Sequence, residues 1–453
     1  MAQQIQMAEA LEPQFNGPVN IAGRLLALAE ETVGLQLPIR LRAWDGSEAG
    51  VDGAPVVVIR DKRALRHIMW SPGELGIARA YVQGHLDVEG DLAEGLSSIW
   101  AAVRTARAAD PDAARPRLRP RLIARGVGLA LRTGAIGRRP PIPAAESQLT
   151  GDLHSRERDR AAISHHYDLS NDFYELLLDE TMAYSSGFHA TPETTLAEAQ
   201  RAKLDLICRK LGLEPGMRML DIGSGWGSLT LFAAENYGVH VTGVTLSGEQ
   251  RDFVMKRATE RGLQDRVDVS LRHFRDLGGA GVTDGGIDAI ASVEMGEHVG
   301  DAEYVVFTES IHRYLRPGGR VLIQQMSRSN DQPGDKPGGG PFIETYIAPD
   351  MHMKPLAKTI GLIADAGLEI RDVQAMREHY PQTVAAWSRN LEDHWATAVA
   401  LVGEEMARVW RLYLAGGSLA FVENRMGVDQ ILAVKPSSTG VSDMPASPKE
   451  WYA

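Results

Sequence analysis

The stretch from residue 217 to residue 250 constrains the fold more than any other part of the chain. Residues 217–222, Met-Arg-Met-Leu-Asp-Ile, predict a short buried strand, and the glycine-rich turn Gly-Ser-Gly-Trp-Gly follows at 223–227. Residues 228–237 predict a helix with an apolar face, Gly238 ends it, and residues 239–244 predict a second strand. The stretch is therefore a βαβ unit, and its turn lies at the edge where open parallel sheets bind ligands.

The details of this turn favour S-adenosylmethionine (SAM) over a dinucleotide as the ligand. The spacing of Gly223, Gly225 and Gly227 lacks the third glycine position of the GxGxxG pattern. Asp221 ends the first strand with a carboxylate, which suits the cationic amino-acid part of SAM. Glycines also let the backbone pass close to a ligand, although such a turn can serve as structural punctuation alone. The flanking strand and helix favour the ligand-binding interpretation.

From about residue 151 to residue 435, helices and strands alternate regularly, which predicts an α/β fold with a Rossmann-like doubly wound sheet. Further helices are predicted at 195–211, 247–262, 356–366 and 381–414, and further strands at 266–271, 286–293, 320–326 and 430–434. A polar loop at 327–340 is placed to act as a lid. Residues 436–453 are expected to be disordered.

Residues 1–110 predict a small α+β domain, for which lipid is a candidate ligand. Its predicted strands are 38–44 and 55–59, and its predicted helices are 62–70 and 73–83. A linker rich in Pro, Arg and Gly follows at 111–150. Within it, the segment 115–139 holds eight arginines and no acid, interleaved with apolar residues. Two interpretations stay open: a contact with the anionic surface of a membrane, or a solvated linker.

Composition excludes several classes of protein. The 453 residues suggest two or three domains, and a net charge of −11 argues against nucleic acid as the main partner. Cys208 is the only cysteine, which rules out an internal disulfide and agrees with a reducing cytoplasm. The N-terminus lacks a signal-peptide pattern, and no apolar run approaches the roughly 18 residues of a membrane span. We therefore expect a cytoplasmic protein, peripheral at the inner membrane face, with no metal.

Five motifs together resemble the cyclopropane fatty acid synthase and mycolic acid methyltransferase family in order and spacing. They are HYDLSND at 166–172, MAYSS at 182–186, LDIGSGWG at 220–227, GVTLSGEQ at 243–250 and EHVG at 297–300. The resemblance covers roughly residues 155–435, and residues 35–95 are similar to the N-terminal domain of longer members. It implies a class I SAM-dependent methyltransferase fold.

The resemblance also implies a set of cofactor-binding residues. The SAM pocket would be lined by Tyr167, Tyr184, Ser185, Gly223 and Gly225; the adenosine part would be held by Thr245, Leu246 and Gln250; and the adenine would be flanked by Arg272, His273 and Phe274. Thr245 stands where an acid usually holds the ribose hydroxyls. Gln250 has a second interpretation, as the capping partner of Ser247 at a helix start.

In this family the resemblance implies a bound bicarbonate as the base, held by a glutamate, a histidine, a tyrosine and the backbone at a cysteine. Glu297 and Tyr380 match, whereas Ser186 replaces the cysteine, Gln324 the histidine and Met326 an aliphatic residue. His298 is a candidate partner of Glu297, with a structural role as the alternative. A carbocation intermediate would be stabilised by aromatic faces, unless these pack only in the core; the candidates are Tyr184, Phe188, Phe274 and Tyr380.

We therefore predict SAM-dependent methyl transfer to the double bond of unsaturated acyl chains in phospholipids. The altered base site and residues 343–353 look more like relatives that make 10-methylene fatty acids, so a methylene branch is favoured over a cyclopropane ring. The alternatives are a ring-forming synthase, a small-molecule methyltransferase, and a non-catalytic protein that binds lipid or SAM. A separate reductase acting on a methylene product and assembly into a homo-oligomer are left open.

Overall fold

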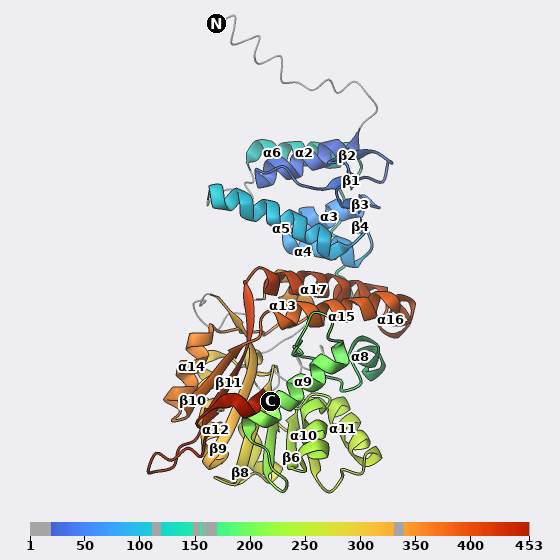
Figure 1. Ribbon diagram of the computed structural model, residues 1–453. Coiled ribbons are helices and arrows are strands. Elements are labelled where there is room, and N and C mark those ends of the chain that lie inside the picture. The colour runs from blue at the N-terminus through green and yellow to red at the C-terminus, as the bar shows by residue number, and fades with distance from the viewer. Residues whose placement is uncertain are drawn as a thin grey trace, which may run out of the picture. The chain divides into compact units, whose positions relative to one another are not determined.

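The computed structural model describes residues 20–110, 119–147, 155, 158, 170–329 and 339–452 (Figure 1). The chain divides into two compact units, Met1–Ala144 and Ala145–Ala453. Most of the predicted lid, residues 330–338, lies outside the described residues. Within the described ranges, no helix is both long and apolar enough to cross a membrane.

The first unit is an α+β module around a small mixed sheet in the order β2-β1-β3-β4. Its strands are β1 (Arg40–Arg42), β2 (Glu48–Gly50), β3 (Val56–Ile59) and β4 (Leu86–Glu89). Its helices are α2 (Ile21–Val33), α3 (Arg63–Trp70), α4 (Glu74–Val82), α5 (Leu92–Ala109) and α6 (Pro120–Arg132). Apolar side chains of α2, the sheet and α6 share one core, which includes Leu25, Leu41, Ile59 and Leu129.

Helix α6 is a departure from the sequence analysis, which predicts a linker without periodicity over residues 111–150. Arg119 precedes the helix and Pro120 is its first residue, a position where proline needs no amide partner. Glycines and arginines dilute the apolar pattern of this segment. The segment nevertheless buries Leu122, Leu129 and Ala130.

The second unit contains a seven-stranded sheet in the order β10-β11-β9-β8-β5-β6-β7, which confirms the predicted α/β fold. Its strands are β5 (Arg218–Ile222), β6 (His240–Thr245), β7 (Val267–Leu271), β8 (Ile287–Val293), β9 (Leu315–Arg328), β10 (Glu369–Ala375) and β11 (Met426–Val434). The first five are parallel, whereas β11 is antiparallel to both of its neighbours. Edge strand β10 buries no residue, which explains why no apolar run predicts it.

Helices cover both faces of this sheet, as a doubly wound fold requires. They are α8 (Asn171–Leu177), α9 (Leu196–Leu211), α10 (Ser228–Tyr237), α11 (Gly248–Glu260), α12 (Asp301–Tyr314), α13 (Pro341–Tyr346), α14 (Leu356–Asp365), α15 (His379–Asp393), α16 (Trp395–Val402) and α17 (Glu404–Val422). Figure 1 shows α10 and α11 on one side of the strands and α12 and α14 on the other. One core cluster joins the sheet to α9, α10 and α11, and a second joins it to α12 and α14.

Two further expectations need correction. The predicted helix at 381–414 is three helices, because the chain breaks at His394 and Gly403. Residues 436–452, expected to be disordered, are described by the structure and end in a 3-10 turn, Pro448–Trp451. Trp451 is only 7% exposed and packs with the cluster that contains α9. An aromatic side chain with a core site to fill therefore anchors a segment whose composition alone indicates disorder.

Candidate active site

The glycine turn has the shape that the sequence predicts, directly after β5. Gly223, Gly225 and Gly227 have φ values of +84°, +53° and +76°, a region that other residues rarely adopt. A Cβ atom on Gly223 would lie 2.8 Å from the Met295 side chain, whereas one on Gly225 would meet nothing within 4 Å. The backbone at Gly225 therefore faces open space beside the first turn of α10.

This space is a cavity at the carboxyl ends of β5, β6 and β8. It is lined by nearly all of the predicted cofactor-binding residues: Tyr184, Ser185, Asp221, Gly223, Gly225, Thr245, Leu246, Gln250, Arg272, His273 and Phe274. Tyr167 lies outside the described residues. Predicted His298 also lines the cavity, together with Met182, Trp226, Glu294 and Met295, which the sequence analysis does not assign.

Polar groups at two ends of the cavity are fixed by hydrogen bonds. Asp221 is buried and accepts a hydrogen bond from the Thr230 hydroxyl at 2.7 Å. Burial raises the pKa of Asp221 to about 6, so the group is largely a carboxylate at neutral pH. At the other end, the Thr245 hydroxyl donates to the side-chain oxygen Oε1 of Gln250 at 2.7 Å, while the backbone amide of Gln250 donates to Ser247 Oγ at 3.3 Å. Gln250 thus belongs to both the helix cap and the cavity wall.

The donor set of this cavity fits SAM. The Asp221 carboxylate suits an ammonium or sulfonium cation, and the glycine backbone leaves room for the ligand to lie against β5. His273 and Phe274, with ring centroids 4.4 Å apart, offer flat faces at which a purine could stack. The cavity therefore has one region for each part of the cofactor.

Next to the cavity, the carboxylate of Glu294 is held by three donors. The Ser186 amide and the Gln324 side-chain amide both donate to Oε1 at 2.9 Å, and the Tyr380 hydroxyl donates to Oε2 at 2.6 Å. Ser186, Gln324 and Tyr380 are the residues expected to hold bicarbonate. The structure brings them together, but around a carboxylate that belongs to the chain itself.

Glu297, expected at the base site, occupies a different place. It lies in the 3-10 turn Gly296–His298, is 1% exposed, and does not line the cavity. Among the described residues, neither of its carboxyl oxygens has a hydrogen-bond partner. Burial and then the charge of Glu294 raise the pKa of Glu297 to about 8. The nearby backbone amides of Glu297 and Met326 oppose this rise, although neither makes a hydrogen bond of full geometry to the carboxyl group.

The two glutamates form a coupled pair with different environments. Burial raises the pKa of Glu294, but the donors Tyr380, Ser186 and Gln324 and the charge of Lys203 lower it. Hydrogen bonds to a carboxylate favour its ionised form, and Glu297 has none of comparable strength. The donors therefore favour the charge on Glu294 and the proton on Glu297, and the residues predicted to surround Glu297 lie around Glu294 instead.

The position of Glu294 in the sequence indicates a functional residue only weakly. Glu294 directly follows β8, at the sheet edge that binds ligands, three positions before the glutamate of the EHVG motif. It has a φ of +51°, a strained conformation for a residue other than glycine, and its amide donates to Gln324 O at 2.6 Å. Backbone strain next to a cavity is typical of functional sites, yet no sequence pattern reports it.

Buried polar side chains fix the donors of Glu294. Lys203 on α9 is fully buried and donates to Ser185 Oγ at 2.8 Å, and Gln200 donates to the Ser185 carbonyl at 2.7 Å. Both hold the segment that carries the Ser186 amide. Gln324 is held in turn by Gln430, whose Nε2 donates to Gln324 Oε1 at 3.0 Å. The Gln324 amide is thereby oriented with its NH2 group toward Glu294.

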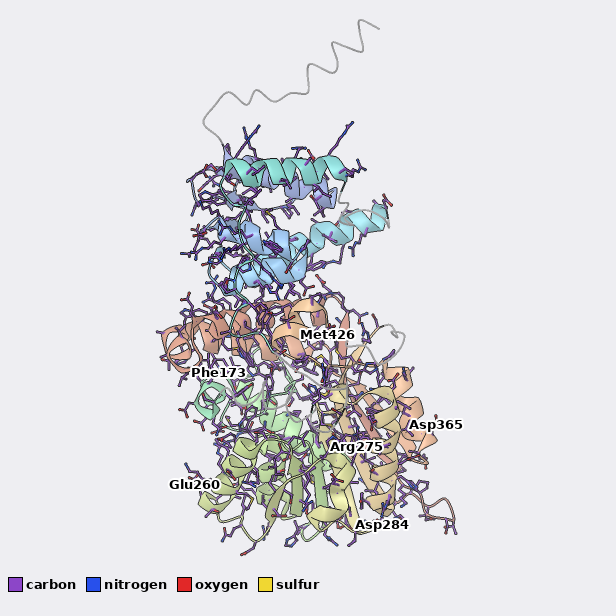
Figure 2. All side chains as sticks on the ribbon, turned by 180° about the vertical axis from the view of Figure 1, so that it is seen from behind. Phe173, Glu260, Arg275, Asp284, Asp365 and Met426 are labelled. Atoms are coloured by element: carbon purple, nitrogen blue, oxygen red, sulfur yellow. The ribbon has the colours of Figure 1, made fainter. Side chains whose placement is uncertain are left out.

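An aromatic cluster from α8, the loop after it, α15 and α17 lies beside Glu294. Tyr184 packs against Trp387 and Trp410, with ring centroids 5.3 and 5.8 Å away. Tyr380 lies 6.2 Å from Trp387. Phe173 of α8, labelled in Figure 2, has its ring centroid 5.3 Å from that of Trp410. These rings make one side of the site apolar.

Of the four aromatic residues expected to stabilise a cation, Phe188 is misplaced. It does not line the cavity and packs instead against the core and against His379, with ring centroids 4.7 Å apart. Tyr184 and Phe274 do line the cavity, and the Tyr380 hydroxyl donates to Glu294. For Phe188 the structure therefore agrees with the alternative of core packing.

The sheet order, the antiparallel β11 and the glycine cavity define a class I SAM-dependent methyltransferase. The family model described as "Mycolic acid cyclopropane synthetase" matches residues 154–431. The chain belongs to this family, as the five sequence motifs predict.

Relatives and solved structures agree with this membership. A Pseudomonas putida protein named "Probable fatty acid methyltransferase" is 36% identical over 92% of this chain and 97% of its own length. "Tuberculostearic acid methyltransferase UfaA1" of Mycobacterium tuberculosis is 31% identical over 90% of each chain. The structure of mycolic acid cyclopropane synthase CmaA1 with SAH and CTAB matches 60% of this chain and 97% of its own, with 31% identity and a TM-score of 0.55.

Proposed function

We propose that the protein transfers the methyl group of SAM to the double bond of an unsaturated fatty acyl chain in a phospholipid, and that Glu294 is the base. The observation that carries this proposal is the Glu294 carboxylate, which is half-buried, held by three donors and part of the lining of the cofactor cavity. A carboxylate in this setting can remove a proton from a reacting group. The fatty acid methyltransferases among the relatives support the substrate class.

The residues divide the chemistry between them. Bound SAM supplies an electrophilic methyl group. The alkene π pair forms a carbon–carbon bond to that methyl group as the sulfur–carbon bond breaks, which leaves a cation on the acyl chain. Tyr184 and its neighbours Trp387 and Trp410 keep water away from this cation, and their faces stabilise it. Glu294 then takes a proton from the new methyl group. The released C–H electron pair closes a cyclopropane ring onto the cationic carbon, or, if a hydride has first shifted from the methylated carbon to that carbon, forms an exocyclic double bond.

A separate bicarbonate does not fit this site. Ser186, Gln324 and Tyr380 are the donors that it would need, and each already donates to Glu294. The chain thus supplies its own base. We expect turnover to be unchanged in buffer freed of carbon dioxide and bicarbonate, and a dependence on added bicarbonate would contradict this assignment.

Between the two products, we favour the methylene branch. Gln324 cannot titrate, unlike the histidine that the family resemblance implies there, and one relative is named a tuberculostearic acid methyltransferase. A methylene product would then be the substrate of a separate reductase. The ring-forming reaction is the second candidate, because both products come from the same cation and lose a proton from the new methyl group; they differ in whether a hydride shifts before that proton leaves.

The test uses purified protein, SAM with a labelled methyl group, and vesicles of a monounsaturated phospholipid. We expect label in the acyl chain, and proton NMR of the product will distinguish exocyclic methylene protons from cyclopropane protons. The control is Gly225→Val, which places a branched side chain in the SAM cavity. Acyl chains without label, under conditions where SAM binds, would refute the proposed reaction and favour a non-catalytic lipid-binding protein.

A further inference from the structure

Helix α6 of the first unit has one face that the module uses. Leu122, Leu129 and Ala130 are buried, and Leu129 belongs to the core cluster with α2 and the sheet. A Cβ atom on Gly126 would lie 3.4 Å from Leu28 of α2, so the two helices pack closely there. Figure 1 shows α6 and α2 side by side.

A second face of α6 carries apolar side chains that pack against little in the module. Ile123, Val127 and Leu131 are 51%, 40% and 63% exposed. They are spaced by four residues, so at about 100° per residue they form one stripe along the helix. None of the three belongs to the core cluster of the module, so this stripe is available to an apolar environment outside it.

The third face of α6 is cationic. Arg121, Arg125 and Arg132 are exposed and lie roughly 140° around the helix from the apolar stripe. Arg125 forms an ion pair with Glu31 of α2 at 2.5 Å, which leaves Arg121 and Arg132 as the main charges of this face. Arg119 extends it at the start of the helix. The helix contains no acidic residue, although the whole chain carries a net charge of −11.

We infer that the outward surface of α6 docks the enzyme on an anionic phospholipid bilayer. The apolar stripe would enter the boundary between headgroups and acyl chains, and the arginines would contact the lipid phosphates. Interfacial helices combine these two features: an apolar face that inserts and cations beside it. An acidic protein needs such a local cationic surface, because the rest of its charge is repelled by anionic lipid.

This docking surface deepens the proposed function, and the inference rests on that function for the need to reach a substrate in a bilayer. An acyl chain inside a bilayer must be reached from the bilayer surface, so an enzyme with this substrate gains from a helix that holds it there. Charge complementarity selects the anionic bilayer among possible occupants. In a two-fold contact between two copies through this surface, the arginines of one copy would face those of the other, and a neutral apolar partner would not need them.

The test is flotation of the full-length protein with two kinds of vesicle, phosphatidylcholine alone and an equal mixture with phosphatidylglycerol. The apolar variant is Ile123→Ser with Leu131→Ser, for which we expect binding to the mixed vesicles to fall on the order of tenfold or more. The cationic variant is Arg121→Gln with Arg132→Gln. We expect it to lose about fivefold per arginine at low salt on the mixed vesicles, and nothing on the neutral ones.

Matched controls lie elsewhere in the same unit. Val51→Ser changes an apolar side chain that is 53% exposed, and Arg107→Gln removes an exposed charge from α5; both should bind as the parent protein does. Thermal melting checks that each variant is folded. Equal vesicle binding by all folded variants would overturn the inference, as would a change of the apolar variant in oligomeric state alone, since a second copy would then cover the stripe.

Activity separates this inference from the proposed function. With a monounsaturated acyl substrate in neutral detergent micelles, where no anionic surface is needed, the α6 variants should turn over like the parent protein. Activity in micelles that is lost only on mixed vesicles supports docking through α6. No activity of the parent protein on either substrate refutes the proposed function, whereas the flotation result still decides the docking surface.

Discussion

The replacement Glu294→Gln tests the assignment of the base most directly, because it removes one charge and keeps the shape. Oε1 of Glu294 accepts from both Ser186 and Gln324, so the carboxamide oxygen of the variant must stay at that position. Its NH2 group then faces the Tyr380 hydroxyl, which can turn and accept a hydrogen bond. All three contacts survive, and the local structure should be retained.

The expected loss is kinetic. A glutamine cannot take a proton, and loss of a positioned general base costs on the order of 100-fold to 10,000-fold in turnover. Stability should not fall with activity, because burial raises the pKa of Glu294 and the variant removes this buried charge. We therefore expect a melting temperature equal to or above that of the parent protein at neutral pH.

The assay compares methyl incorporation, SAM affinity by calorimetry and thermal melting. Its control is Glu297→Gln, the same chemical change three residues away and outside the cavity lining. We expect this control to keep turnover within a few-fold. Full turnover by Glu294→Gln would refute the assignment, and loss of turnover by Glu297→Gln alone would return the role of base to the glutamate that the sequence motif indicates.

Three further predictions concern the same site. The pKa of Glu297 in the folded protein is raised to about 8, so the folded state holds a proton that the unfolded chain releases near pH 4.3. The free energy of unfolding should therefore fall as the pH rises from about 4.3 to about 8. Urea titrations of Glu297→Gln should lack that fall. Lys203→Met removes a buried cation that favours ionised Glu294, so the acid limb of the pH–rate profile should move to higher pH. Gln200→Met, which removes only hydrogen bonds to the same segment, should leave that limb in place. Gly225→Val puts a branched residue at a φ of +53° in the cavity wall, and calorimetry should show SAM binding lost while circular dichroism shows a folded protein.

The cofactor cavity could be predicted from the sequence because its residues follow local rules. Gly223, Gly225, Asp221 and Gln250 lie within one βαβ unit, where strand, turn and helix start are written in consecutive residues. The doubly wound sheet with its two helical layers follows from the same alternation, whereas edge strand β10 does not.

The base could not be predicted in this way. The donors Ser186, Gln324 and Tyr380 come from a loop, from β9 and from α15, and only the fold places them around Glu294 rather than Glu297. Two glutamates three positions apart look alike in a sequence. What separates them is a backbone turn at φ +51° and the supply of hydrogen-bond donors on one side of it.

The chain leaves the sheet after β10, forms the three helices α15, α16 and α17, and returns to the sheet at β11, the strand next to β10. Ala375, the last residue of β10, pairs with Asp429 of β11, and the next amide, Met376, bonds the Val428 carbonyl. A segment whose two ends are pinned together can change in length or sequence at little cost to the scaffold. Since this segment carries Tyr380, Trp387 and Trp410 but no residue that lines the cofactor cavity, we expect that exchanging it between relatives changes the aromatic side of the site and leaves SAM binding as it is.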